Sequence, residues 1–269
     1  MSERTRSTWQ GLAGAAVLLA FLGGTWQTYA AKADHFFLPT PEQIGARLAD
    51  EWLTVDVAHL FLTSSALTAI GQTFATAVVA WLIAALLGIC LGVLTGSVRL
   101  LDEITQAPFL LLRSIPGVAL IPIFIAILGL GSDMRIAVVA IGCVWPVLLN
   151  TAAGIRQLEP LYLDVSRVMR QGHAARILTV LLPAIMPKVF AGLRVSLAFA
   201  LVMTVATEML AGSGGLGALA IRYRSTFDVS GLWATLAVLA ACGLLLNAVV
   251  VLSENSLLKW HKKWRSASE

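Results

Sequence analysis

Three ionisable side chains lie inside long apolar blocks of the sequence: Arg113, Arg194 and Glu208. Charged side chains in apolar surroundings are costly, so they usually pair with one another or mark a functional site. Two interpretations remain open here. The three residues serve as structural ion pairs or interface anchors, or they line a pathway or gate. If a solute passing this region were an anion, Arg113 or Arg194 could help to conduct it.

The residue patterns needed for catalysis or metal binding are missing from the sequence. Cys90, Cys143 and Cys242 sit apart inside apolar blocks, without CxxC spacing or a nearby His, which is typical of packing residues. No nucleophile–base cluster and no G-x-x-x-x-G-K-[ST] loop for nucleotide phosphates occurs. We therefore expect that the chain is not an enzyme and binds no metal or cofactor itself.

The elements that position these residues follow from the composition. Of the 269 residues, 58% are hydrophobic and only 13% are charged, whereas soluble domains carry roughly a quarter charged residues. The apolar blocks are about 20 residues long, which is enough to cross a bilayer as a helix. The sequence therefore predicts an all-α, polytopic membrane protein. The six predicted spans are 10–30, 69–96, 108–130, 136–154, 189–211 and 231–253.

The distribution of basic residues predicts the orientation of these spans, because cytoplasmic loops are enriched in Lys and Arg. With the N-terminus inside, twelve basic residues fall in cytoplasmic segments and five in outer ones. The outer five are Lys32, Arg47, Arg135, Arg222 and Arg224. Both termini are thus predicted to be cytoplasmic, and the net charge of +4 is attributed to topology and not to nucleic-acid binding.

The N-terminus has an alternative interpretation. Arg4 and Arg6, an apolar stretch and Ala31-Lys-Ala33 also resemble a secretory signal with its cleavage site. The apolar stretch is long for a signal core, so we expect that the first span is retained.

Two connections are too long to be simple turns. In the outer connector 31–68, Thr40 is a suitable N-cap and Pro41 a suitable first residue for a short amphipathic helix. This connector either is merely solvated or docks a partner. In the cytoplasmic connection 155–188, Pro160 could start a helix that stops near Gly172, and a second short helix, 174–182, precedes Pro183. Such helices either lie on the bilayer surface or fit a groove in a partner protein.

Three prolines, Pro116, Pro122 and Pro146, interrupt the third and fourth spans. Neighbouring groups can satisfy the carbonyls that a proline frees in a membrane helix. The prolines either hinge a gate or shape the bundle. Asn150 and Thr151 are predicted to form hydrogen bonds between helices.

The segment from Asp164 to Pro183 resembles the EAA loop of binding-protein-dependent ABC importer permeases. The family's acidic position falls on Asp164, and its terminal Leu-Pro falls on Leu182 and Pro183. The match is degenerate. Asp164 replaces glutamate, Val165-Ser166 replaces paired alanines, and Arg170 stands where glycine is expected, with Gly172 two residues later.

Further segments resemble the nitrate/sulfonate/taurine branch of this family. They occur in consistent order over most of the chain, and they are 37–41, 112–116, 119–122, 145–151, 192–194, 207–209 and 214–217.

The resemblance implies a type I ABC importer permease fold, with 1–269 as a single transmembrane domain in the bacterial inner membrane. It implies a dimer, a homodimer by default, with two cytoplasmic ATPases that carry ATP and Mg and an extracytoplasmic solute-binding protein. The implied ATPase-coupling residues are Asp164, Val165, Ser166, Val168, Met169, Arg170, Gln171, Gly172, Leu182 and Pro183. The pathway or gate candidates are Arg113, Pro116, Asn150, Arg194 and Glu208.

The expected function is transport of a small polar or anionic solute, such as nitrate, a sulfonate or a taurine-like compound. Two alternatives stay open. A non-transporting membrane scaffold would explain the degenerate loop. An ion-coupled secondary transporter would need carboxylates near mid-membrane and usually inverted repeats, whereas Glu208 is the only carboxylate within the predicted spans.

Overall fold

The computed structural model describes residues 3–33, 36–53, 62–158, 169, 172–212 and 214–257. These residues form two compact units, one from the segments 1–68 and 219–238 and the other from 69–218 and 239–269. Helices α3 (Ser64–Ser97), α10 (Gly215–Ser225) and α11 (Val229–Leu257) each contribute to both units.

The first unit contains α1 (Glu3–Ala33), α2 (Pro41–Trp52) and the adjoining parts of α10 and α11. The predicted start of α2 is confirmed, because the Thr40 side chain accepts from the Gln43 amide in a capping box and Pro41 follows at the first helical position. Trp26 of α1 packs on Trp233 of α11 with ring centroids 5.3 Å apart. The Trp233 indole N–H also donates to the Phe37 carbonyl at 3.2 Å.

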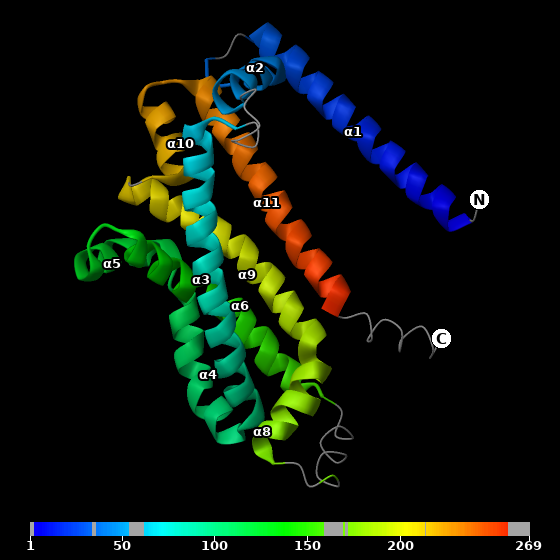
Figure 1. The fold of residues 1–269 in the computed structure, drawn as a ribbon, viewed down its shortest axis with the longest axis vertical. Coiled ribbons are helices and arrows are strands. Elements are labelled where there is room, and N and C mark those ends of the chain that lie inside the picture. Colours follow the sequence, from blue (N-terminus) through cyan, green and yellow to red (C-terminus); the bar gives the residue numbers. More distant parts are fainter. Residues whose placement is uncertain are drawn as a thin grey trace. The chain divides into compact units, whose positions relative to one another are not determined.

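The second unit is built around α6 (Ser132–Arg156), which lies between α3 (Ser64–Ser97) and α9 (Leu182–Ala211) (Figure 1). Its buried core combines residues of α3, α6 and α9, including Ala80, Val138, Cys143 and Ala200. Two polar contacts fix α9. Ser196 donates to the Cys143 carbonyl at 2.7 Å, and Trp81 donates to the Leu193 carbonyl at 3.1 Å.

Glycines bring these helices into close contact. On α3, Gly88, Gly92 and Gly96 lie at four-residue spacing against α6, and a Cβ on Gly92 would come within 2.6 Å of the Thr151 Cβ. A Cβ on Gly192 of α9 would come within 2.9 Å of the Pro146 carbonyl oxygen of α6. Small residues at such spacing allow helices to pack tightly in membranes, where van der Waals contact is a main driving force for association.

The third predicted span, 108–130, is not one straight helix. It is replaced by α4 (Arg99–Ser114), a 3-10 turn (Gly117–Leu120) and α5 (Ile121–Leu128), with a bend of 82° between the two parts. The chain breaks at Ile115–Pro116 because the residue before a proline disfavours the helical conformation, and Ile115 adopts an extended ψ of 120°.

A second boundary also differs from the prediction. The predicted short helix 174–182 does not end before Pro183, since α8 (His173–Arg176), a π-helical turn (Ile177–Leu181) and α9 follow one another without a break. In this turn the Leu182 amide donates to the Ile177 carbonyl, five residues back. The wider turn relieves the clash that a proline ring makes with the carbonyl four residues earlier.

Four helices of the described residues are long and apolar enough to span a membrane: 64–97, 132–156, 177–211 and 229–257. The bent pair of α4 and α5 would make a fifth. The first predicted span, 10–30, lies within α1, which is not among these helices. Large exposed apolar side chains cover α1, α3, α9 and α11, among them Phe21, Leu86, Val202 and Leu244.

Candidate functional site

Glu208 is completely buried near the C-terminal end of α9, and its carboxylate is held by hydrogen bonds from two other helices. The Thr73 hydroxyl of α3 lies 3.0 and 2.9 Å from the two carboxylate oxygens. The Gly217 amide, in the first turn of α10, donates to Oε2 at 2.9 Å. The Leu216 amide donates to the Thr73 hydroxyl oxygen at 2.9 Å. Glu208 therefore binds the first turn of α10 to α3 and α9.

The glycines after Glu208 are what permit this arrangement. Gly215 has a φ of +86°, which L side chains rarely adopt, and a Cβ at that position would overlap the Glu208 carboxyl group. A Cβ on Gly217 would come within 2.5 Å of the Val205 carbonyl. The Gly214-Gly-Leu-Gly217 segment thus allows the backbone to approach the carboxylate closely enough for an amide to donate to it.

Arg135 supplies the positive charge nearest to this carboxylate. Its guanidinium Nη1 lies 3.9 Å from Glu208 Oε1, and the residue is only 9% exposed. The fourth predicted span begins at 136, whereas α6 begins at Ser132, so Arg135 lies within the first turn of this helix and not in a connecting segment. Its predicted place on the outer side stays a prediction. Because this span was predicted to start at 136, Arg135 was not recognised as a basic partner of Glu208.

The cluster holds Glu208 in one place. Hydrogen bonds and the nearby Arg135 guanidinium favour the ionised form of the Glu208 carboxyl group, whereas its complete burial opposes ionisation. The groups that donate hydrogen bonds to Glu208 belong to the backbone of α10 or to the packed helix α3. We interpret the cluster as a structural anchor.

Arg194, the second candidate, forms an ion pair with Glu254 of α11. The arginine side chain is 46% exposed and the glutamate 23%, so the pair lies at the edge of the second unit. This arrangement accords with structural pairing, one of the two roles expected for Arg194. Its part in a pathway remains a prediction.

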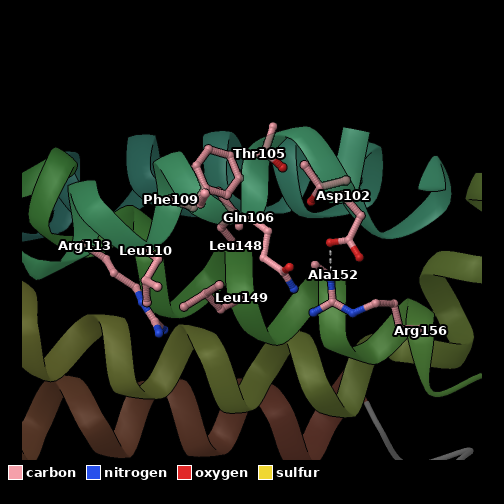
Figure 2. Close-up of a pocket in the computed structure, with 12 residues that line it drawn as sticks. Asp102, Thr105, Gln106, Phe109, Leu110, Arg113, Leu148, Leu149, Ala152 and Arg156 are labelled. Carbon is pink, nitrogen blue, oxygen red and sulfur yellow. Dashed lines mark hydrogen bonds and ion pairs between the residues drawn. The ribbon is translucent and has the colours of Figure 1, made fainter. Parts of the chain in front are cut away.

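Arg113, the third candidate, lies at the C-terminal end of α4 and lines a cavity of about 460 Å³ between α3, α4 and α6 (Figure 2). Asp102 and Gln106 of α4 line the same cavity. Arg156 of α6 donates to Asp102 at 2.6 Å across it. The cavity therefore has polar groups from both helices, and Leu110 of α4 with Leu148 and Leu149 of α6 gives it apolar surface.

The remaining gate candidates are placed apart from these charges. Pro116 stands at the break between α4 and the 3-10 turn. The Asn150 amide donates to the Pro146 carbonyl one turn earlier at 2.8 Å, so this bond lies within α6 and not between helices as predicted. The Thr151 hydroxyl is buried and has no hydrogen-bond partner among the described residues.

The coupling residues lie largely outside the described residues. Asp164, Val165, Ser166, Val168, Arg170 and Gln171 all fall there. Of the described ones, Met169 is 64% exposed, Gly172 precedes α8, and Leu182 and Pro183 begin α9 directly after the π-helical turn. The coupling role of all ten residues remains a prediction.

A separate cluster of charges lies in the first unit. Arg47 of α2 pairs with Glu51 at 2.7 Å and with Asp228, and the Tyr223 hydroxyl donates to Glu51 at 2.6 Å. Burial alone would raise the pKa of the Asp228 carboxyl. The Gly231 amide, the Ser230 hydroxyl and Arg47 stabilise its ionised form more strongly, so the pKa is held below its usual value. These contacts fasten α2 to the turn before α11.

Two signals in the sequence could have identified parts of this geometry. Asp102, Gln106, Phe109 and Arg113 follow the i, i+4, i+7, i+11 spacing of one helix face. The glycines of α3 repeat every fourth residue, a known sign of close helix packing.

Together, the long apolar helices and the charges paired among them define a polytopic α-helical membrane protein. More than half of the chain, residues 84–259, matches the family described as binding-protein-dependent transport system inner membrane component. The chain belongs to this family of transport permeases, and it is a multi-pass protein of the inner membrane. The predicted resemblance is thereby confirmed.

Two relatives illustrate the match. The chain is 30% identical over 188 residues to the putative aliphatic sulfonates transport permease protein SsuC of Bacillus subtilis (strain 168), covering 70% of this chain and 68% of that protein. It is 34% identical over 172 residues to the nitrate import permease protein NrtB of Leptolyngbya laminosa, covering 64% of this chain and 62% of that protein. The chain thus spans somewhat less than two thirds of the nitrate permease.

A solved structure shares the fold. A chain of the MetNI methionine ABC transporter, in inward-facing conformations, superimposes with a TM-score of 0.64 at 19% identity, over 70% of this chain and 94% of that chain. The predicted all-α, type I ABC importer permease fold is therefore confirmed.

Proposed function

We propose that two copies of this chain form the membrane pathway of an ATP-driven importer for a small oxyanion. The observation that carries the proposal is the match of residues 84–259, which runs from α3 through the 155–188 connection to the end of α11. A pathway subunit of this kind needs a separate ATPase, since the sequence has no loop for nucleotide phosphates. ATP and Mg are accordingly assigned to that ATPase.

The 155–188 connection is the proposed contact with the ATPase, and 31–68 is the proposed extracytoplasmic connector. Both belong to one transmembrane domain, 1–269, with the two termini in the cytoplasm. The excess of basic residues in the proposed cytoplasmic segments supports this orientation. A solute-binding protein would deliver the substrate at the outer face.

The proposed substrate class follows from the relatives, which are named for aliphatic sulfonates and for nitrate. These anions share a compact oxygen-bearing group with delocalised charge. Arg113 supplies positive charge at a cavity of the second unit, where such a group could be guided. Arg194 is paired with Glu254, so it could take part only if this pair opened. The family match supports ATP-driven transport over ion-coupled transport. Glu208 is also the only carboxylate within the predicted spans, whereas a secondary transporter needs carboxylates near mid-membrane.

Affinity purification from native membranes in mild detergent tests this assembly. We expect a stoichiometric ATPase to co-purify with the wild-type chain, and we expect the double variant Asp164→Ala, Gly172→Leu to lose it. The variant Asp50→Asn, on the proposed outer connector, serves as the control and should retain the ATPase. Recovery of intact chain without any ATPase, across several detergents, would favour a non-transporting scaffold.

Reconstitution tests the transport itself. The purified complex, its ATPase and its binding protein are placed in proteoliposomes, and uptake of nitrate and ethanesulfonate is measured with and without ATP. ATP-dependent uptake of either anion supports the proposal. Uptake that persists without ATP and stops when the proton gradient is dissipated would replace it with ion-coupled transport.

A further inference from the structure

Helix α4 has two chemically different faces. Asp102, Gln106 and Arg113 lie on one face together with Phe109, and all four line the cavity between α3, α4 and α6. The opposite face carries Leu100, Ile104 and Leu111, which are 65%, 61% and 71% exposed. Apolar side chains so exposed suit a lipid or protein environment, so α4 turns its polar face toward the cavity.

The cavity combines a polar and an apolar wall. Figure 2 shows Gln106 and Arg113 reaching from α4 toward α6, with Leu110 and Leu149 between them. Its volume, about 460 Å³, exceeds what a compact ion needs and leaves room for a short apolar group beside it. Small-molecule sites commonly have this mixture of apolar walls and a few convergent polar groups.

The charges of the cavity do not cancel among the described residues. Arg156 is neutralised by Asp102 at 2.6 Å. Arg113 has no ion pair with another described residue, which leaves one positive charge in excess along the lining. The Gln106 side chain adds N–H donors on the same helix face.

We propose that this cavity is a binding subsite for an oxyanion group, with Arg113 as its charge partner and Gln106 as an added donor. A guanidinium presents paired N–H groups that match the oxygens of a sulfonate, nitrate or phosphate. Leu110 and Leu149 would contact a short alkyl group next to the anion. The inference rests on the proposed function for its role as a station on the import pathway, but its binding chemistry is measured independently.

A free oxyanion and the phosphate of a phospholipid headgroup share this chemistry, and the experiment separates them. The full-length chain, with its co-purifying subunits, is placed in phosphatidylcholine nanodiscs and titrated calorimetrically with sodium ethanesulfonate or sodium nitrate. Propionamide, uncharged and of similar size, serves as the control solute. We expect saturable binding of an anion and none of propionamide.

Variants locate the site. Arg113→Gln should weaken anion binding about tenfold, because a hydrogen bond to a charged group is lost. Gln106→Leu should weaken it several-fold. Arg99→Gln removes the same charge from the same helix, but this side chain is 94% exposed and pairs with Glu103 outside the cavity. The anion affinity of the Arg99→Gln variant should stay within about twofold of that of the wild type. Equal affinities of the Arg113→Gln and Arg99→Gln variants, or no anion binding by the wild type, would overturn the proposal.

Two further measurements keep the result interpretable. Arg113→Lys keeps the charge and controls for misfolding of the Arg113→Gln variant. At equal monodispersity, it should bind the anion better than Arg113→Gln does. Native mass spectrometry of the chain in phosphatidylglycerol nanodiscs tests for a bound lipid. A phospholipid headgroup is the ligand if the wild type retains a lipid that the Arg113→Gln variant loses. If ethanesulfonate or nitrate no longer competes for the cavity in phosphatidylglycerol nanodiscs, the lipid headgroup is likewise identified as its occupant. Anion binding without any ATP-driven uptake would refute the proposed function and leave this subsite standing.

Discussion

The Thr73 hydroxyl and the Glu208 carboxylate meet inside the second unit, with the hydroxyl oxygen 2.9 Å from Oε2 and 3.0 Å from Oε1. Both residues are fully buried. Because the same hydroxyl accepts from the Leu216 amide, removing it leaves that amide without its acceptor and takes one donor from the carboxylate, which keeps the Gly217 amide. The contact therefore supports both the carboxylate and the first turn of α10.

Thr73→Val should lower the free energy of unfolding by about 2 kcal/mol, since a buried hydrogen bond to a charged group is lost while the side-chain volume is kept. The measurement is thermal unfolding of the purified chain in detergent. Thr95→Val provides the matched control on α3, because the Thr95 hydroxyl bonds only to carbonyls of its own helix. Equal melting temperatures for the two variants would contradict the assigned role of Thr73.

Gly215→Ala should be severely destabilising, by at least about 2 kcal/mol. The added Cβ would meet the Glu208 carboxyl group, and the φ of +86° is strained for any L side chain. Gly131→Ala is the control, since nothing lies within 4 Å of a Cβ there and its φ is −179°. Membrane abundance and melting temperature report both variants. A Gly215→Ala chain as stable as the control would show that α10 does not close on Glu208.

Gly92→Ala tests the contact between α3 and α6. Its Cβ would lie 2.6 Å from the Thr151 Cβ, so we expect a loss of about 1–3 kcal/mol from overpacking. Gly71→Ala on the same helix meets nothing within 4 Å, and it should be neutral or slightly stabilising because alanine favours helices. Thermal unfolding of the two variants side by side gives the difference. A negligible loss for Gly92→Ala would argue against the close packing.

Asp228→Asn tests whether the ionised Asp228 carboxylate makes the stability of the protein depend on pH. The folded-state pKa of Asp228 lies below its usual value of 3.8. Its ionised form therefore adds stability above that pH, and the contribution disappears as the pH falls through the lowered folded pKa. We expect the variant to be about 1 kcal/mol less stable at pH 7, because the pair with Arg47 is partly exposed. The two proteins should converge at acidic pH, as followed by melting temperature.

The exposed carboxylate of Asp50 supplies the control for this series, since it lies on α2 next to the same cluster. Asp50→Asn should change stability little at neutral pH. A difference between wild type and Asp228→Asn that stays constant down to the most acidic pH would rule out the ionised carboxylate as its source.

The pair of Arg194 and Glu254 can be tested by exchanging its charges. Arg194→Glu places two acidic side chains together and should lower stability by about 1 kcal/mol, and adding Glu254→Arg should restore most of it. Uptake measured at normal membrane abundance decides the other role. Unchanged transport in Arg194→Gln would remove this arginine from the pathway candidates, whereas lost transport with intact stability would keep it.

The sequence predicted the helical membrane architecture well because apolar block length is a direct consequence of bilayer thickness. Glu208 could be singled out for the same reason, as a carboxylate within an apolar block. Its partners could not, because Thr73 and Arg135 lie 135 and 73 positions away and only folding brings them together. Arg135 was also misplaced by an error of a few residues in the start of α6.

The errors in the third and fifth spans share one cause. The third span was predicted to continue through Pro116, which would either hinge a gate or shape the bundle, and the short helix 174–182 was predicted to end before Pro183, yet the effect of a proline depends on the backbone around it. Before Pro116, Ile115 adopts an extended backbone conformation and the helix ends. At Pro183 the π-helical turn made room for the ring and the helix continued. Periodicity does not distinguish these outcomes, because both depend on local hydrogen bonding.

The unbroken run from His173 to Ala211 has a mechanical consequence. At a rise of 1.5 Å per residue, it is a rod roughly 58 Å long. One end adjoins the proposed ATPase contact, and the other carries Glu208. A displacement at His173 would reach the far end as a tilt or rotation of the whole helix, with the π-helical turn as its most compliant point. In the proposed assembly, motion of the ATPase would then reach the contact between Glu208 and α10 through one continuous helix.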